Sequence, residues 1–202
     1  MIPLKEFIEN IDRYFPDYSH MTPWGLLADL DLIVLKIIAG LSDEYKIIGN
    51  TAIHKTAVLE ENVSLKGTVV ISENCHISAN AYLRGPIFLG IGVKIGPGSE
   101  IKHSFISDNS AIAHFNYIGN SIIGQDSNFE AGSICANHYN EKKEKAISVR
   151  YKGIVYPTNC EKFGSLVGDC SKIGANAVLS PGTILTRGSI VRRLELIEQS
   201  EL

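Results

Sequence analysis

Residues 71–101 read ISENCHISANAYLRGPIFLGIGVKIGPGSEI, and an aliphatic residue returns in this stretch at every sixth position. The same period extends back along the chain, so that ten positions share it: Ile47, Ile53, Leu59, Leu65, Ile71, Ile77, Leu83, Leu89, Ile95 and Ile101. Four positions after each of the first eight stands a residue that is mostly small or apolar, such as Ala57, Cys75 and Ala81. A period of six fits neither an α-helix nor an ordinary alternating strand. It is typical of a chain that turns a corner every six residues and closes a three-sided coil in eighteen.

Two inward positions in every six residues predict a narrow prism with a filled interior. The predicted fold class is therefore mainly β, a left-handed parallel β-helix of hexapeptide repeats over residues 46–191. The phase slips by one residue between Ile101 and Ile106, and again between Ile118 and Ile123. Residues 136–162 lose the period and are rich in charge, which predicts an excursion from the prism, with a hairpin built on residues 147–156. Period six then returns from Val167 to Val191.

The two ends of the chain have a different pattern. Residues 1–45 predict a helical N-terminal segment, whose second helix starts after Thr22 with Pro23 in its first turn and stops at Gly40. This helix is apolar on more than one face, so we expect it to be sandwiched, with the open end of the prism as the place that needs such a cover. Residues 192–202 predict a short, polar C-terminal helix.

Composition excludes several classes of protein. The 202 residues include 19 basic and 22 acidic side chains, and this mildly acidic balance argues against a nucleic-acid partner. The most apolar stretch, residues 30–41, is too short to span a bilayer, and residues 1–6 do not begin a signal peptide. Four cysteines without export signals favour reduced thiols. We therefore expect a cytoplasmic protein with no membrane partner.

Polar side chains that the prism does not need gather around one segment. Residues 113–120 read AHFNYIGN, and residues 128–137 read NFEAGSICAN. His114 stands two positions after the inward Ile112, which places it on the outer surface or at a corner. A lone histidine there would most often be a solvated surface group. Here a hydroxyl at Tyr117 and amides at Asn128 and Asn137 accompany it, and these groups suit a sugar better than a metal ion.

Over residues 83–145 the chain resembles the acetyltransferase domain of the bifunctional glucosamine-1-phosphate acetyltransferase/N-acetylglucosamine-1-phosphate uridylyltransferases. The motifs that carry the resemblance are, in order, Arg84, Lys102, His114 with Tyr117 and Gly119, Asn128 before residues 130–134 (EAGSI), and Asn137. Residues 162–169 (KFGSLVGD) and 179–182 (LSPG) resemble the archaeal-type branch of sugar-phosphate nucleotidylyltransferase/acetyltransferases, as do residues 23–27 (PWGLL), which resemble its helical linker. No Gly-rich nucleotide loop precedes these residues, so we expect no nucleotidylyltransferase activity.

The resemblance implies acetyl transfer from acetyl-CoA to the amine of an amino-sugar phosphate, with glucosamine-1-phosphate as the first choice. His114 would be the catalytic base, because imidazole is the side chain that exchanges a proton near neutral pH. Arg84 and Lys102 would hold the phosphate. Tyr117, Asn128 and Asn137 would fix the sugar, and Lys143 aligns with a lysine of the family, although a solvated charge fits that position nearly as well.

The cosubstrate and the assembly are predicted on weaker signals. Acetyl-CoA would bind along the later coils near Ala175 and Ser180, with Arg187 and Arg192 as partners for its phosphates; a solubilising role fits each arginine equally well. Proteins of this shape commonly associate side by side as homotrimers with clefts between neighbours, which we expect here. Acetyl transfer of this kind requires no metal.

Two departures from the family pattern and three alternatives stay open. Glu130 replaces a glycine and His138 replaces a tyrosine, which puts the identity of the sugar in doubt. One alternative is acetyl transfer to another amino sugar or to a nucleotide sugar. A second is a non-catalytic trimeric scaffold. A third is a zinc-dependent carbonic anhydrase of the same fold, for which His76, His103 and His114 are the candidate ligands.

Overall fold

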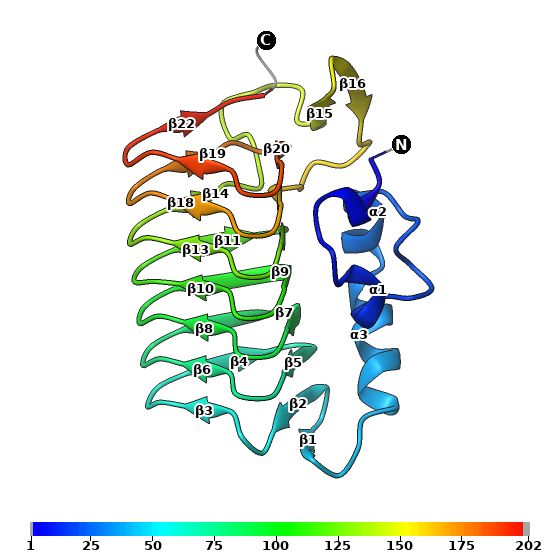
Figure 1. The fold of residues 1–202 in the computed structure, drawn as a ribbon, viewed down its shortest axis with the longest axis vertical. Helices are drawn as coiled ribbons and strands as arrows, with labels where there is room; N and C mark the ends of the chain where they lie inside the picture. Colours follow the sequence, from blue (N-terminus) through cyan, green and yellow to red (C-terminus); the bar gives the residue numbers. More distant parts are fainter. Residues whose placement is uncertain (1, 200–202) are drawn as a thin grey trace.

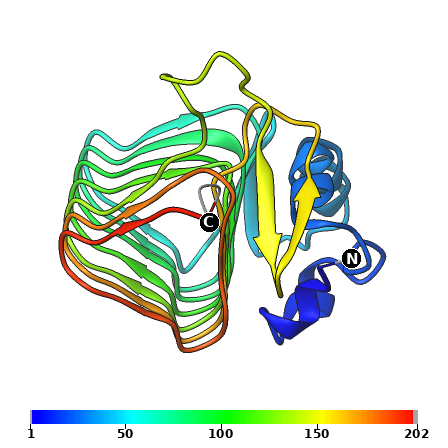
Figure 2. The same ribbon diagram turned by 90° about the horizontal axis from the view of Figure 1, so that it is seen from above.

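The computed structural model describes residues 2–199 and shows a three-sided, left-handed parallel β-helix with a helical layer along one side (Figure 1). Seen from above, the coils stack into a triangular prism, and three flat faces are visible (Figure 2). The predicted fold class is confirmed in its main part. We call the faces I, II and III in the order in which the chain passes through them.

Each face is a stack of short parallel strands, one from each coil. Face I consists of β4 (Ser64–Lys66), the first parts of β7 (Tyr82–Leu89) and β9 (Glu100–Ile106), β11 (Tyr117–Gly119), β14 (Ile134–Cys135), β19 (Val178–Leu179) and β22 (Leu196–Ile197). Face II consists of β2 (Thr51–His54), β5 (Val69–Ile71), the second parts of β7 and β9, β12 (Ile122–Ile123), β17 (Ser165–Val167) and β20 (Thr183–Leu185). Face III consists of β3 (Val58–Leu59), β6 (His76–Ile77), β8 (Lys94–Ile95), β10 (Ala111–Ile112), β13 (Asn128–Phe129), β18 (Lys172–Ile173) and β21 (Ile190–Val191).

The period-six residues fill the interior of the prism. Ile77, Leu83, Ile95 and Ile101 are fully buried in one continuous core. The prediction that Ile47 is the first inward residue of the prism is wrong, because its side chain is 45% exposed. Ile47 lies on β1 (Tyr45–Ile48), which turns back and pairs antiparallel with β2. The stacked coils therefore begin at β2.

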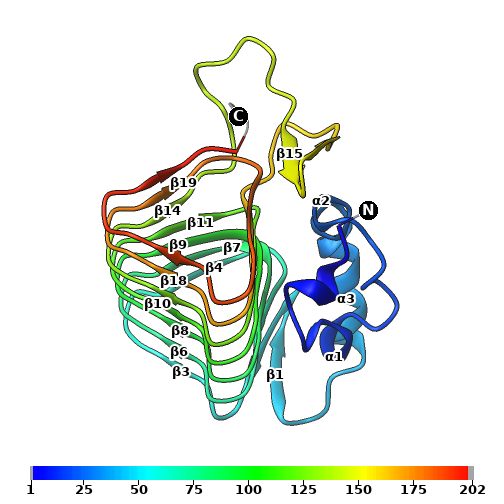
Figure 3. The same ribbon diagram turned by 45° about the horizontal axis from the view of Figure 1, so that its top comes forward.

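The two phase slips and the excursion all lie at the corner between faces I and II. His103 and Asn120 turn this corner with φ angles of +47° and +45°, so that five residues rather than six separate successive inward positions. The aperiodic stretch leaves the prism at the same corner, between β14 and β17, and its outermost part projects away from the coils (Figure 3). The irregular features of the chain thus gather along one edge.

The helical layer covers face II rather than the end of the prism, which corrects the predicted placement. It consists of η1 (Leu4–Glu6), α1 (Ile11–Tyr14), α2 (Pro23–Ala28) and α3 (Leu30–Ala39). The Thr22 hydroxyl oxygen caps α2 by accepting from the Gly25 amide at 3.2 Å, as the sequence predicts. The reason for the placement is that the outward side chains of face II are apolar: Val70, Phe88, Phe105, Ile122, Leu166 and Ile184. Such a face must be covered, since each large apolar side chain removed from water contributes roughly 1.5–3 kcal/mol.

The predicted hairpin is present, whereas the predicted C-terminal helix is wrong. The hairpin pairs β15 (Ser148–Tyr151) with β16 (Ile154–Pro157) in antiparallel register. The tail instead forms β22, which pairs parallel with β19 and adds one more coil to face I. Ile197 stands six positions after the inward Val191 and packs against the same core, so the period continues through the tail. Residues 200–202 of the predicted helix lie outside the described residues.

No helix within residues 2–199 is both long and apolar enough to cross a membrane.

Candidate active site

A row of basic side chains crosses face I. The parallel register aligns Arg84 with Lys102, and Lys102 with Gly119, on successive coils. Neighbouring strands in a sheet lie about 4.8 Å apart, so side chains in one row reach the same ligand. Glu100 stands in the adjacent row, where its carboxylate accepts from the Arg84 guanidinium at 2.7 Å. Two predicted phosphate ligands are thus brought together on one face.

The electrostatics of this row favour an anion. Burial lowers the pKa of Lys102, and the nearby charges of Lys162 and Arg84 lower it further, against the opposing effect of Glu100. Lys102 therefore lies near two other cations, Arg84 on face I and Lys162 in the excursion, and the charge of Glu100 opposes their effect. A phosphate would relieve their mutual repulsion and accept their hydrogen bonds.

Tyr117 and Asn137 border the basic row. Tyr117 is half-buried, and its hydroxyl lies over Gly119, where an added Cβ would come within 2.6 Å of the hydroxyl oxygen. The side chain of Asn137 also hydrogen-bonds this hydroxyl, and its amide donates to the Asn120 side-chain oxygen at 2.6 Å. Burial, followed by the charge of Glu100, raises the pKa of Tyr117, which keeps its phenol protonated and able to donate.

His114 lies at the corner between faces III and I, beside the strand that carries Tyr117. The residue is exposed, and its imidazole makes no hydrogen bond or ion pair with any other residue between 2 and 199. Its backbone oxygen is held by the amide of Gly132 at 2.9 Å. The next residue, Phe115, has a φ of +54° and packs its ring over Gly98. The backbone at this corner is therefore fixed, while the ring nitrogens of His114 are free to meet a ligand.

Asn128 is separated from the other predicted sugar ligands. It lies on β13 of face III, one face away from Tyr117 and Lys102, and its side chain is exposed. Within one chain it therefore does not contact the basic row.

The carboxylate of Glu130 forms hydrogen bonds with residues of the following coils and not with the basic row. Its carboxylate accepts from the Arg193 guanidinium at 2.7 and 2.8 Å and from the Ala175 amide at 2.9 Å. These hydrogen bonds lower the pKa of Glu130, with Arg193 as the largest cause. The carboxylate that replaces the glycine of the family thus has a structural partner in this chain.

Three of the four predicted CoA ligands lie in the coils beyond His114. Ala175 occupies the same corner as His114, two coils further along, since residues at this corner are linked by backbone hydrogen bonds through Ala131. Ser180 lies on face I, and its hydroxyl donates to Glu198 at 3.2 Å. Arg192 lines a cavity of about 480 Å³ on face III together with Asn128. These positions could contact one extended ligand that runs past the corner.

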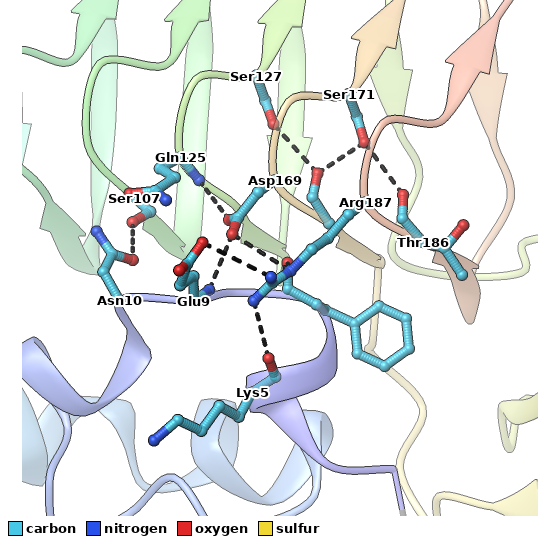
Figure 4. Close-up of polar contacts among 12 residues, drawn as sticks. Lys5, Glu9, Asn10, Ser107, Gln125, Ser127, Asp169, Ser171, Thr186 and Arg187 are labelled. Carbon is cyan, nitrogen blue, oxygen red and sulfur yellow. Dashed lines mark hydrogen bonds and ion pairs between the residues drawn. The ribbon is translucent and has the colours of Figure 1, made fainter.

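Arg187 does not belong to this group, and the prediction of a CoA contact is not supported by its position. It lies at the corner between faces II and III, where its guanidinium donates to the backbone oxygens of Lys5 at 2.9 Å and Phe7 at 3.2 Å (Figure 4). The buried carboxylate of Asp169 lies 3.5 Å away and accepts from the amide of Glu9. Arg187 and Asp169 therefore anchor the N-terminal segment.

The excursion holds Lys143 and His138 in different environments. Lys143 is exposed in the projecting part, and no described contact joins it to the basic row. His138 is half-buried, and its Nδ1 has no hydrogen-bond partner among the described residues.

The three histidines considered for zinc lie apart from one another in the chain. His76 pairs with Glu60 at 2.6 Å on face III, and His103 donates to the Leu27 carbonyl oxygen at 2.6 Å beside α2. Within residues 2–199 no three or more His, Cys, Asp or Glu side chains gather as a metal site.

Sequence reasoning missed two basic residues near the site. Lys66 aligns with Arg84 in the register of face I and precedes it by eighteen residues, one full coil. The eighteen-residue spacing of Lys66, Arg84 and Lys102 would have been enough to predict that Lys66 lies in the same row. Lys162 gave no such signal, because it lies in the aperiodic stretch.

A cavity of about 590 Å³ lies elsewhere. It opens between α3 and the β1–β2 hairpin, and none of the predicted site residues line it.

Known proteins resemble this chain in sequence. No protein-family model matches the chain. The bifunctional protein GlmU of Methanococcus maripaludis is 30% identical over 207 residues, which cover 97% of this chain and 49% of that protein. A bifunctional sugar-1-phosphate nucleotidylyltransferase/acetyltransferase of Sulfurisphaera tokodaii is 34% identical over 142 residues, covering 61% of this chain and 35% of that protein. The chain thus spans about half or less of the length of these relatives.

Among solved structures, LpxA from Bacteroides fragilis 9343, a UDP-N-acetylglucosamine acyltransferase, aligns with a TM-score of 0.48 at 20% identity, over 77% of this chain and 61% of that one. The sequence relatives, the hexapeptide ladder and the coiled prism lead to one conclusion. The chain is related to the GlmU-type bifunctional proteins, and it folds as a left-handed β-helix of hexapeptide repeats.

Proposed function

We propose that this protein transfers an acetyl group from acetyl-CoA to the amine of an amino-sugar phosphate. The observation that carries the proposal is the row of Arg84 and Lys102 on face I, bordered by Tyr117 and by the free imidazole of His114. A prism needs none of these side chains on its surface. Together they supply an anion site, a hydroxyl donor and a base within a few coils of one another.

The proposed reaction begins with the acceptor amine. His114 removes a proton from the ammonium group, because an ammonium has no lone pair with which to attack. The neutral amine then forms a C–N bond with the thioester carbonyl carbon, and the C–S bond breaks to release CoA thiolate. The thiolate takes up the proton that His114 removed in the first step, and the neutral His114 then accepts the second proton from the nitrogen. No metal takes part in this route.

The phosphate of the acceptor is the group that fixes its position. Arg84 offers a fork of N–H donors, and Lys102 offers a compact charge. Tyr117 and Asn137 would then contact the sugar hydroxyls. Glucosamine-1-phosphate is the simplest acceptor of this kind and the one that the resemblance implies. Holding the amine close to the thioester makes the attack effectively unimolecular, which can supply roughly 7–11 kcal/mol of rate enhancement at best.

Acetyl-CoA would run past the corner of His114 toward Ala175, Ser180 and Arg192. The position of Asn128 on face III supports a side-by-side homotrimer, in which face III of one protomer would meet face I of the next. Asn128 would then reach the neighbour's acceptor, and so could Lys143 on its projecting loop. The free thiols of Cys75 and Cys135 suit the reducing cytoplasm that supplies acetyl-CoA.

The test is the release of free thiol from acetyl-CoA with a panel of acceptors: glucosamine-1-phosphate, glucosamine-6-phosphate, glucosamine and nucleotide-linked amino sugars. We expect turnover with the 1-phosphate and a much lower kcat/KM with unphosphorylated glucosamine. Light scattering of the same sample should give the mass of a trimer. A folded protein that turns over no acceptor would support the scaffold alternative and overturn the proposal.

A further inference from the structure

A second cavity adjoins the basic row at the corner between faces I and II. It has a volume of about 330 Å³, within the size range of small-ligand sites. Trp24 and Leu27 of α2 form one wall, and His103 and Asn120 at the prism corner form another. The remaining side is closed by residues 160–162, which include Glu161 and Lys162. We call this cavity the α2 pocket. His103 and Asn120 directly follow Lys102 and Gly119 in sequence, so the pocket continues the surface of the site.

The apolar wall of the α2 pocket is held rigidly. The ring of Trp24 is half-buried and packs edge-to-face on Phe163, with 5.9 Å between ring centroids. The Nε2–H of His103 donates to the carbonyl oxygen of Leu27 at 2.6 Å, which ties α2 to the prism. Burial lowers the pKa of His103, so this side chain stays neutral. An indole and a leucine thus present a fixed apolar surface beside a charged row.

The charged side of the pocket carries Lys162 and the neighbouring carboxylate of Glu161. Lys162 is exposed and forms no ion pair with an acidic residue between 2 and 199. Its charge lies close enough to Lys102 to be among the groups that depress the lysine's pKa. Like charges that are held close together repel one another, and a ligand with more than one negative charge would relieve this repulsion. A single sugar phosphate on Arg84 and Lys102 leaves Lys162 and the apolar wall unused.

We propose that the α2 pocket binds the nucleoside of a nucleotide-linked amino sugar, with its diphosphate lying between Lys162 and the Lys102–Arg84 row. The proposal rests on the proposed function in placing the sugar phosphate on Arg84 and Lys102. A planar base fits an apolar slot beside Trp24, and its phosphates fit the adjacent cations. The pocket lies at the Lys102 side of face I, away from Ala175 and Arg192, which favours the acceptor over the nucleotide part of CoA. Glucosamine-1-phosphate is then the minimal acceptor, and the nucleotide-linked sugar is the better one.

Trp24 makes the test direct, because it is the only tryptophan in the chain and lines the pocket. Its fluorescence should be titrated with UDP, GDP, CDP and ADP, with inorganic pyrophosphate, and with adenosine 3′,5′-bisphosphate as the nucleotide part of CoA. We expect a saturable change with at least one nucleoside diphosphate, at a Kd at least tenfold lower than that of pyrophosphate. Lys162→Ala should raise this Kd at least fivefold. Lys46→Ala, which removes an exposed lysine from β1, outside the stacked coils, should leave it unchanged.

The outcomes separate this proposal from the proposed function, because binding does not require acetyl transfer. Acetylation of glucosamine-1-phosphate without any nucleotide response of Trp24 would keep the function and overturn the pocket. A response to adenosine 3′,5′-bisphosphate stronger than to any nucleoside diphosphate would overturn the assignment to the acceptor. A saturable diphosphate response in a protein without turnover would keep the pocket and reject the transferase. Circular dichroism of Lys162→Ala should match the wild type, so that a lost response cannot come from unfolding.

Discussion

Faces I and II share two long strands but serve different purposes. β7 and β9 each pass from face I to face II, so one strand contributes Lys102 to the first and Phe105 to the second. On face II the outward side chains are apolar and lie beneath the helical layer, where Phe105 is fully buried. On face I the outward side chains of the coils around Lys102 are charged or polar and remain accessible, whereas later coils of this face expose Ile134 and Leu196. The backbone geometry is shared, so the outward residues alone decide which face stabilises the protein and which can bind a ligand.

The largest effect should come from face II. Phe105→Ala should lower the free energy of unfolding by about 3–5 kcal/mol, because it removes a buried ring that packs on Phe15 and Phe88. Urea denaturation measures this change. Leu32→Ala is the matched control, since Leu32 is 71% exposed and should cost less than about 0.5 kcal/mol. Equal losses in the two variants would contradict the view that face II is held by its cover.

A smaller effect, on function alone, is expected from face I. Lys102→Ala should reduce kcat/KM for the acceptor by about 10- to 150-fold, because the variant loses one hydrogen bond to the charged phosphate. The free energy of unfolding should stay within about 0.5 kcal/mol of the wild type, since the side chain is partly exposed and repelled by its neighbours. Lys46→Ala on β1, outside the stacked coils, should change neither quantity. A large loss of stability in Lys102→Ala would mean that this lysine stabilises the fold, and it would contradict a role in ligand binding alone.

A variant of Arg187 tests whether this residue anchors the N-terminal segment or binds CoA. Arg187→Ala should lower the free energy of unfolding by roughly 1–2 kcal/mol through the loss of its bonds to Lys5 and Phe7. The KM for acetyl-CoA should not change. Arg192→Ala should show the reverse pattern, with a raised KM and unchanged stability. The opposite assignment of the two effects would restore Arg187 to the cofactor site.

The smallest effect concerns pH. The pKa of Lys102 is lowered, chiefly by burial, so this lysine loses its charge at a lower pH than an ordinary lysine. Binding of an anion should therefore weaken as pH rises through this depressed pKa. Sulfate is a suitable probe, since its charge is constant between pH 7 and 10. Lys102→Arg should bind sulfate with little dependence on pH over this range, and a parallel decline in both proteins would exclude Lys102 as its cause.

The sequence predicted the coils well because every six-residue repeat requires two inward side chains that are small or apolar. The period also continued to Ile197, so the last coil could have been found, but the polar residues around it suggested a helix. The position of the helical layer depends on the outward residues Phe88, Phe105 and Ile122, which form a stripe only after the coils are aligned. Periodicity alone does not reveal that stripe.

The candidate site was predictable where it follows the ladder. The fixed coil length aligns Arg84 and Lys102, and the same spacing would have added Lys66. Lys162 could not be found, because the path of the excursion depends on contacts with Phe163 and α2 that have no sequence period. Arg187 was misplaced for a related reason: its partners are backbone oxygens far away in the sequence.

The central claim is that face I and its corner carry acetyl transfer with His114 as the base. The most direct test is kcat for thiol release with glucosamine-1-phosphate by His114→Ala, measured beside its free energy of unfolding. Because the imidazole makes no contact within the described chain, stability should be unchanged, whereas kcat should fall by about 10²- to 10⁴-fold. A His114→Ala protein that keeps kcat within threefold of the wild type would contradict the account.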